Sequence, residues 1–294
     1  MSAGRLRFVC YMVIATALFG ACNVMLKYAY EGMGPYWCGV FRFAVAAAAI
    51  FLVFRGRIME SLRMVAPRVW LPPTVFMGGA FLAAGLTVNM TTATNAGFFF
   101  SLPMLFAPLL GLIAFRKRFG AGTVALQGAV LVGLYLLCCN TGSLGFGPGE
   151  AMGLACSAFY AAALVFGERA VDEMDPFALA FVQLACSCVL FLGCALAFEP
   201  FPAFAPEHAV PWIAVVLLAV STALAFALQD LSLERISPTV VAVIVCSEPI
   251  FTALFAFGFL GETLSAIGLV GAGIVVACTV LASTVDVDAA LQRG

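Results

Sequence analysis

Charged residues are scarce in this sequence. Asp, Glu, Lys and Arg make up 10% of the 294 residues, whereas hydrophobic residues make up 64%. A soluble domain usually has about 25% charged and about 45–50% apolar residues. A surface compatible with water could hardly be built from this composition, so the sequence indicates a chain that is solvated largely by lipid. The net charge of −1 gives no general attraction to nucleic acid, and we expect no nucleic-acid partner.

Residues and motifs that bind metals or catalyse reactions are equally sparse. The single histidine, His208, has no ligand partner nearby in the sequence, and the eleven cysteines form no Cys-x-x-Cys pair. Most cysteines lie in apolar runs, where we expect them to act as small apolar residues. The HExxH, GxSxG and GxxxxGK[ST] motifs are absent. We therefore expect no metal, no cofactor, no enzymatic activity and no ATP-driven step within this chain.

Long hydrophobic runs dominate what is present. A membrane-spanning helix needs about 20 mostly apolar residues, and runs of about that length are separated by short segments with turn residues and charges. Ten transmembrane helices are predicted, at residues 8–27, 35–54, 72–92, 95–115, 121–139, 149–168, 176–197, 210–230, 237–259 and 263–283. The expected fold class is an all-α polytopic membrane protein. The first run ends in Lys27 rather than a small-residue cleavage site, so it is interpreted as a helix and not as a signal peptide.

The basic residues gather on one side of this arrangement. If the N-terminus is cytoplasmic, every Lys and Arg except Lys27 and Arg42 falls on the cytoplasmic side. The outer segments carry glutamates instead, namely Glu31, Glu150, Glu199, Glu207 and Glu262. The positive-inside rule therefore predicts an integral plasma-membrane protein (inner membrane if bacterial) with both termini in the cytoplasm.

Matching residues indicate an internal repeat with a period of about 140 residues. The pairs, in the same order along both halves, are Pro35 with Pro176, Arg42 with Gln183, Trp70 with Trp212, and Pro103 with Pro249. Two repeats are predicted, residues 1–143 and residues 144–294, each with five helices and the second with a short cytoplasmic tail. Because five is odd, the second repeat must be inverted in the membrane. Inverted repeats are typical of carriers that alternate between inward-open and outward-open states.

Two segments carry a resemblance to a known family. They are "VCSEPIFTALFAFGFLGETLSAIGLVGAGIVV" (residues 245–276), with its Glu248–Pro249 pair, and "GPYWCGVFRFAVAA" (residues 34–47), with Arg42. With these, the chain resembles the EamA-type ten-helix carriers of the drug/metabolite transporter superfamily, from about residue 8 to residue 283. The first half departs from the pattern in lacking a Glu before Pro103.

The resemblance implies a secondary active transporter of small metabolites, often an exporter of amino acids or related metabolites, that works by alternating access. An uptake carrier or a metabolite exchanger remains an alternative, because the orientation of the chain does not set the direction of flux. A membrane scaffold that transports nothing is a more distant one. Monomer and dimer are both compatible with the sequence.

Glu248 is the first candidate for substrate binding or ion coupling. It lies about twelve residues into the ninth run, near mid-membrane at about 1.5 Å per residue. A carboxylate at that depth is costly and should face a cavity or a partner. It could couple transport to protons or bind a substrate ammonium group. Alternatively, it satisfies polar groups at the kink expected at Pro249, which lacks an N–H. Pro103 is expected to kink the fourth run in the same way.

Arg42 and several uncharged residues complete the candidate set. Arg42 lies about 10 Å inside the outer boundary, and could bind a substrate carboxylate or pair with an internal acid or helix-end carbonyls. The resemblance implies a central cavity, and the residues that could line it are Asn23, Asn89, Asn95, Phe99, Tyr160 and Gln229. The amides and Tyr160 could equally hold helices together through hydrogen bonds. Gly149 and Gly153 predict a close helix contact.

Overall fold

The computed structural model describes residues 3–90, 99–115, 121–138, 147–202, 209–260 and 265–284. These ranges hold α-helices and no strand. The helices are α1 (Ala3–Tyr30), α2 (Pro35–Met64), α3 (Pro67–Met90), α5 (Pro103–Phe115), α6 (Ala121–Cys138), α7 (Pro148–Glu173), α8 (Pro176–Phe198), α9 (Ala209–Leu233), α10 (Pro238–Val245), α11 (Glu248–Leu260) and α12 (Ala266–Thr284). Glu207, His208 and Glu262 lie outside these ranges.

Proline begins many of these helices. The helices α2, α3, α5, α7, α8 and α10 all start at a proline. Its fixed φ angle suits the first turn, and the N–H that it lacks would have no partner within the helix there. The prolines therefore set where each of these six helices begins.

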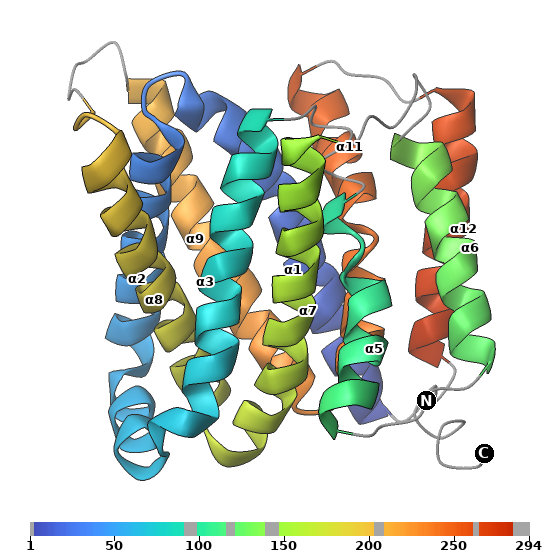
Figure 1. The fold of residues 1–294 in the computed structure, drawn as a ribbon, viewed down its shortest axis with the longest axis horizontal. Coiled ribbons are helices and arrows are strands. Elements are labelled where there is room, and N and C mark those ends of the chain that lie inside the picture. The colour runs from blue at the N-terminus through green and yellow to red at the C-terminus, as the bar shows by residue number, and fades with distance from the viewer. Residues whose placement is uncertain are drawn as a thin grey trace.

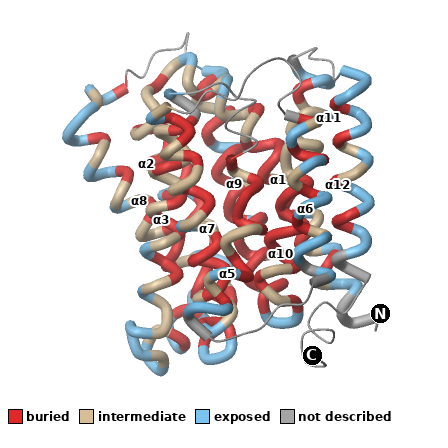
Figure 2. The backbone as a smooth tube through the Cα atoms, turned by 45° about the vertical axis from the view of Figure 1, so that its right-hand side comes forward, coloured by how far each residue is buried: buried red, intermediate tan, exposed pale blue. Residues whose placement is uncertain are grey.

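The helices are long and apolar enough to cross a membrane. Within the described ranges seven meet both criteria, and three shorter apolar helices cover 103–113, 124–137 and 266–281. Their outer faces expose large apolar side chains such as Leu52 and Phe198, which are 78% and 73% exposed. Figure 2 shows buried residues along the middle of the bundle and exposed residues on its outer turns. The predicted all-α polytopic membrane fold is thus confirmed.

The predicted ninth run, 237–259, is divided in two. The helix α10 ends at Val245, and α11 begins at Glu248. Pro249 has no N–H to bond with the carbonyl of Val245 one turn earlier. The chain forms a tighter turn instead, in which the Ser247 N–H donates to the carbonyl of Ile244, three residues earlier, at 2.9 Å.

A similar interruption precedes α5 in the fourth run. A turn covers residues 101–102, directly before Pro103. In it, the Leu102 N–H donates to the Phe99 carbonyl at 3.1 Å. Side chains bond the carbonyls of this interruption, because the Ser157 hydroxyl donates to the Phe99 carbonyl and the Cys246 thiol donates to the Ser101 carbonyl at 3.0 Å.

Helix packing joins the first half of the chain to the second. The helix α1 packs on α9 and α3 on α7, while α2 packs on α8 and α6 on α12. In Figure 1, α2 and α8 lie at one edge of the bundle, α6 and α12 at the other, and α1, α3, α7 and α9 between them. The halves therefore meet at both edges of the bundle as well as in its middle.

Small residues allow some of these helices to approach closely. A Cβ on Gly153 of α7 would lie 2.6 Å from the Cβ of Phe99, and one on Gly149 would lie 2.9 Å from the main-chain carbon of Met90. The close contact predicted at these glycines is confirmed. A comparable contact joins α6 and α12, where a Cβ on Gly271 would lie 2.5 Å from the Gly133 carbonyl oxygen.

Acidic residues tie α2 to α8 at both ends. The Glu199 carboxylate, just after α8, accepts hydrogen bonds from the main-chain N–H groups of Tyr36 (3.1 Å) and Trp37 (3.0 Å) in the first turn of α2. At the other end, Asp175 accepts from the Phe177 N–H at 2.9 Å and forms an ion pair with Arg57 of α2. Each carboxylate thus caps a helix N-terminus, and both contacts bridge the halves.

Candidate functional site

A cavity lies between the two halves of the bundle. Its volume is about 120 Å³, and a single water molecule needs about 15 Å³ on the same scale. Residues from α1, α2, α3, α7, α8, α9 and α11 line it. Tyr30 at the end of α1 and Pro35 at the start of α2 belong to the lining. The cavity therefore reaches toward the end of the bundle that lies opposite the start of α1, and it has room for a small organic molecule.

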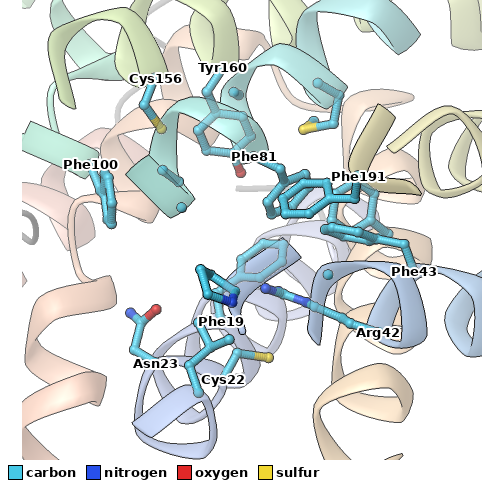
Figure 3. A pocket seen from close by; sticks show the side chains of 18 of the residues that line it. Phe19, Cys22, Asn23, Arg42, Phe43, Phe81, Phe100, Cys156, Tyr160 and Phe191 are labelled. Carbon is cyan, nitrogen blue, oxygen red and sulfur yellow. The ribbon is translucent and has the colours of Figure 1, made fainter. Parts of the chain in front are cut away.

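Arg42 supplies the positive charge of this cavity. Its side chain is buried, and in Figure 3 the guanidinium points into the cavity. The Nε–H donates to the hydroxyl of Thr222 on α9 at 2.8 Å, and the guanidinium lies about 5.1 Å and 5.2 Å from the ring centres of Phe43 and Phe81. Among the described residues, it forms no ion pair with an acid. Because a guanidinium has five N–H donors, most of its hydrogen-bonding capacity remains directed at the cavity.

Glu248 supplies the negative charge. It is the first residue of α11, at the interruption of the ninth run. The side-chain amide of Asn23 on α1 donates to its Oε1 at 2.8 Å, and also to the hydroxyl of Thr252 at 3.1 Å. Within the described ranges, the carboxyl group makes no hydrogen bond to a main-chain group. The structure thus places Glu248 against the cavity and Asn23 rather than against the polar groups freed by Pro249.

Tyr160 and Gln229 form one unit across the interface between α7 and α9. The Tyr160 hydroxyl donates to the side-chain carbonyl of Gln229 at 2.5 Å. Figure 3 shows Tyr160 with its hydroxyl directed into the cavity from the side opposite Asn23 and Cys22. Gln229 is fully buried and is not part of the cavity lining. Of the two predicted residues, only Tyr160 lines the cavity.

Phenylalanine rings form most of the remaining wall. The rings that line it are Phe19, Phe43, Phe81, Phe100, Phe191 and Phe226. Contacts between rings, edge-on or tilted, join Phe19, Phe43, Phe81, Phe191 and Phe226, as with Phe43 and Phe81 at 4.7 Å between centres. Such contacts hold the rings in place and add to the burial of apolar surface.

Phe99 does not line the cavity, although the sequence predicted that it could. It packs against Gly153, and its neighbour Phe100 lines the cavity instead. Successive residues of a helix point about 100° apart, so only one of the two rings can face inward.

Three further predicted or missed residues complete the comparison. Asn95 and the side chain of Asn89 lie outside the part of the chain that the structure describes. Asp230, which directly follows Gln229, is fully buried, and the sequence analysis missed it. An acidic residue inside the eighth predicted run, 210–230, was the signal that could have identified it.

Known proteins share this fold and part of this sequence. Residues 147–284 match the EamA-like transporter family. A protein of Archaeoglobus fulgidus, described as an uncharacterized transporter, is 25% identical over 277 residues, which cover 92% of this chain and 84% of that protein. A solved structure described only as the crystal structure of a protein is 18% identical, with a TM-score of 0.81 over 98% of this chain and 99% of that one. At this identity, the structural likeness establishes the fold alone.

The matched segment contains the chemistry of the second half of the cavity. It includes Tyr160, Thr222 and Glu248, while Asn23 and Arg42 come from the half that lies outside the match. The chain is a polytopic membrane protein whose residues 147–284 are similar to the EamA-like transporter family, and most of its length is similar to a protein described as an uncharacterized transporter.

Proposed function

We propose that this protein is a secondary active carrier that exports small zwitterionic metabolites, chiefly amino acids with apolar side chains, by alternating access. One observation carries the proposal. Arg42 and Glu248, a cation and a carboxyl group from different halves of the chain, line the same cavity, and phenylalanine rings fill the wall between them.

The chemistry of an amino acid fits this cavity at each of its groups. The planar guanidinium of Arg42 can donate two parallel hydrogen bonds to a substrate carboxylate. Glu248 can receive the ammonium group, and the side-chain oxygen of Asn23 is available beside it because its amide nitrogen is the donor to Glu248. The phenylalanine rings favour an apolar side chain. A zwitterion would thus neutralise two charges that are costly to leave unpaired at membrane depth.

The packing supports alternating access. In the predicted repeats, 1–143 and 144–294, α1 corresponds to α7 and α3 corresponds to α9. The contact between α1 and α9 therefore has a counterpart in the contact between α7 and α3, and both contacts are present. Exchanging the two repeats returns the α2–α8 and α6–α12 contacts to themselves. Carriers built from inverted repeats use such symmetry to open first on one side and then on the other. The cavity reaches one end of the bundle, as expected of one of these two states.

The charges support an orientation with a cytoplasmic N-terminus. Arg57 and Arg63 near the end of α2, and Arg235 just after α9, are exposed. The end of α9 lies beside the start of α1, since the Ser232 hydroxyl donates to the Phe8 carbonyl. Because basic residues favour the cytoplasmic side, the cavity of this conformation would open to the outside. Glu248, as the carboxyl group of the cavity, is the residue through which we propose proton coupling.

A binding screen tests the proposed substrate class. A ligand that binds only the folded protein stabilises it by about 2.7 kcal/mol when present at 100 times its Kd. We expect L-phenylalanine or L-leucine to raise the unfolding temperature of the detergent-purified protein, and L-phenylalaninol, which lacks the carboxylate, to raise it less. Equal shifts for both compounds, or no shift with any amino acid, would reject the proposed site.

A transport assay tests the carrier. In proteoliposomes loaded with an unlabelled amino acid that passes the screen, we expect the labelled compound to accumulate by counterflow. Counterflow also detects an uptake carrier or exchanger, so the direction requires a second measurement with imposed gradients in vesicles of known orientation. Absence of counterflow with every compound that binds would favour a scaffold.

A further inference from the structure

Two neighbouring residues near the end of α9, Gln229 and Asp230, have buried polar groups without partners among the described residues. Asp230 has no exposed surface, and neither of its carboxyl oxygens has a hydrogen-bond partner among the described residues. The amide nitrogen of Gln229 and the side-chain oxygen of Gln183 are buried and unpartnered in the same sense. Buried polar groups are nearly always hydrogen-bonded in native proteins, so the unpartnered carboxyl group of Asp230 requires an explanation.

The position of Asp230 separates it from the cavity. It lies three residues before the end of α9, and the hydroxyl of Ser232, in the same turn, donates to the Phe8 carbonyl near the start of α1 at 3.0 Å. The cavity reaches toward the opposite end, where Tyr30 and Pro35 line it. Asp230 therefore lies in the half of the bundle that is closed in this conformation.

A hydrogen bond links Asp230 to the cavity indirectly. Its neighbour Gln229 accepts the hydroxyl of Tyr160, which lines the cavity. Tyr160 lines the same cavity as Glu248 and bonds the residue that precedes Asp230. Tyr160 thus connects the cavity to the buried residues near the end of α9.

Among the described residues, no cation forms a hydrogen bond with Asp230. The helices α1, α2, α7, α8 and α10 pack against α9, and Tyr160 of α7 bonds the neighbouring Gln229. Arg42 of α2 binds Thr222, about two turns earlier on α9. An ionised carboxylate without a partner is strongly disfavoured in such a place. Its retention there is understandable if the group meets a cation in another conformation.

We propose that Asp230, together with Gln229, is the cation-binding site of the inward-facing conformation. This inference rests on the alternating-access function proposed above. When the halves exchange conformations, the cytoplasmic half opens and exposes these groups, and the Asp230 carboxylate pairs with a positive charge that enters from the cytoplasm. That charge is the ammonium group of the substrate or a proton, and the experiments below distinguish the two.

Stability separates this role from a structural one. A carboxyl group that holds the fold together would make its Asn variant unfold at a lower temperature, because its contacts would be weakened. A carboxyl group that binds a cation only in the other conformation has no such contacts here. We therefore expect Asp230→Asn to unfold at the same or a higher temperature than the wild type. The exposed Asp172 of α7 provides a matched control as Asp172→Asn. A marked fall in the unfolding temperature of Asp230→Asn alone would overturn the proposal.

Transport identifies the cation. With L-phenylalanine as the probe, we expect Asp230→Asn to lower counterflow at least tenfold at every pH if the site takes the ammonium group, with partial rescue by Asp230→Glu. If the site takes a proton, counterflow persists but the pH dependence of net efflux is lost. Asp172→Asn should match the wild type in both assays. Wild-type rates and wild-type pH dependence in Asp230→Asn would overturn the proposal without affecting the function proposed above.

Accessibility gives a readout that does not depend on any substrate. In a background with the eleven native cysteines replaced, Asp230→Cys should react with a cationic, membrane-impermeant thiol reagent in inside-out vesicles and not in right-side-out vesicles. Asn23→Cys, in the outward cavity, should show the opposite preference. Failure of position 230 to react from either face would overturn the inference, whereas failure of position 23 to react from outside would count against the proposed function.

Discussion

Arg42→Gln should weaken substrate binding in proportion to the carboxylate contacts that it removes. The guanidinium is buried, one of its N–H groups binds Thr222, and the others face the cavity. A hydrogen bond to a charged group contributes about 1.5–3 kcal/mol net. At about 1.4 kcal/mol per decade, we expect the Kd for an amino acid to rise by about 10- to 150-fold. Arg42→Lys keeps the charge but loses the planar fork, so an intermediate effect is expected.

Comparison of two ligands makes this prediction specific to the carboxylate. Binding of L-phenylalanine and L-phenylalaninol to detergent-purified wild type and variants would be measured by calorimetry. The wild type should prefer L-phenylalanine, and Arg42→Gln should lose that preference while its affinity for L-phenylalaninol changes little. Lys27→Gln, which removes a cation outside the cavity lining, serves as the control and should retain the preference. Equal losses for both ligands in Arg42→Gln would refute the assigned role.

Three further predictions concern coupling and stability. Glu248→Gln should abolish the pH dependence of transport, measured as initial rates in proteoliposomes; a pH profile like that of the wild type would reject the coupling role. Gly153→Ala should lower the stability of the protein in detergent by about 1–3 kcal/mol, because its Cβ would meet that of Phe99. Gly128→Ala, where no atom lies within 4 Å of the added Cβ, is the control and should be neutral or slightly stabilising. Glu199→Ala should cost about 1 kcal/mol through loss of the cap on α2, and an unchanged unfolding temperature would contradict that contact.

Much of the fold could be predicted from local properties of the sequence. Runs of about 20 apolar residues specify helices that cross a bilayer, and the membrane fold confirms that expectation. The interruptions at Pro103 and Pro249 were also foreseeable, because a proline near the middle of a membrane-spanning run removes an N–H from the helix interior. The close contacts at Gly149 and Gly153 follow from their lack of a side chain.

The composition of the cavity depended on the tertiary structure. Asn23 meets Glu248, and Arg42 meets Thr222, across separations of 225 and 180 residues. No local pattern encodes these pairs, because they arise from the angle and register at which helices of the two halves pack. The same packing turns Phe100 rather than Phe99 into the cavity, since a rotation of about 100° between neighbours decides which ring faces inward.

The sequence by itself therefore determined the solvent, the membrane spans and the helix interruptions, because hydrophobicity and proline act over a few turns of chain. Only the tertiary structure decided which polar residues share a cavity and which are sealed away. Asp230 illustrates the difference: its sequence reveals an acid in an apolar run, but its burial without a partner results from helices that approach from both halves. Contacts between distant segments create that environment, and so the structure was needed to see it.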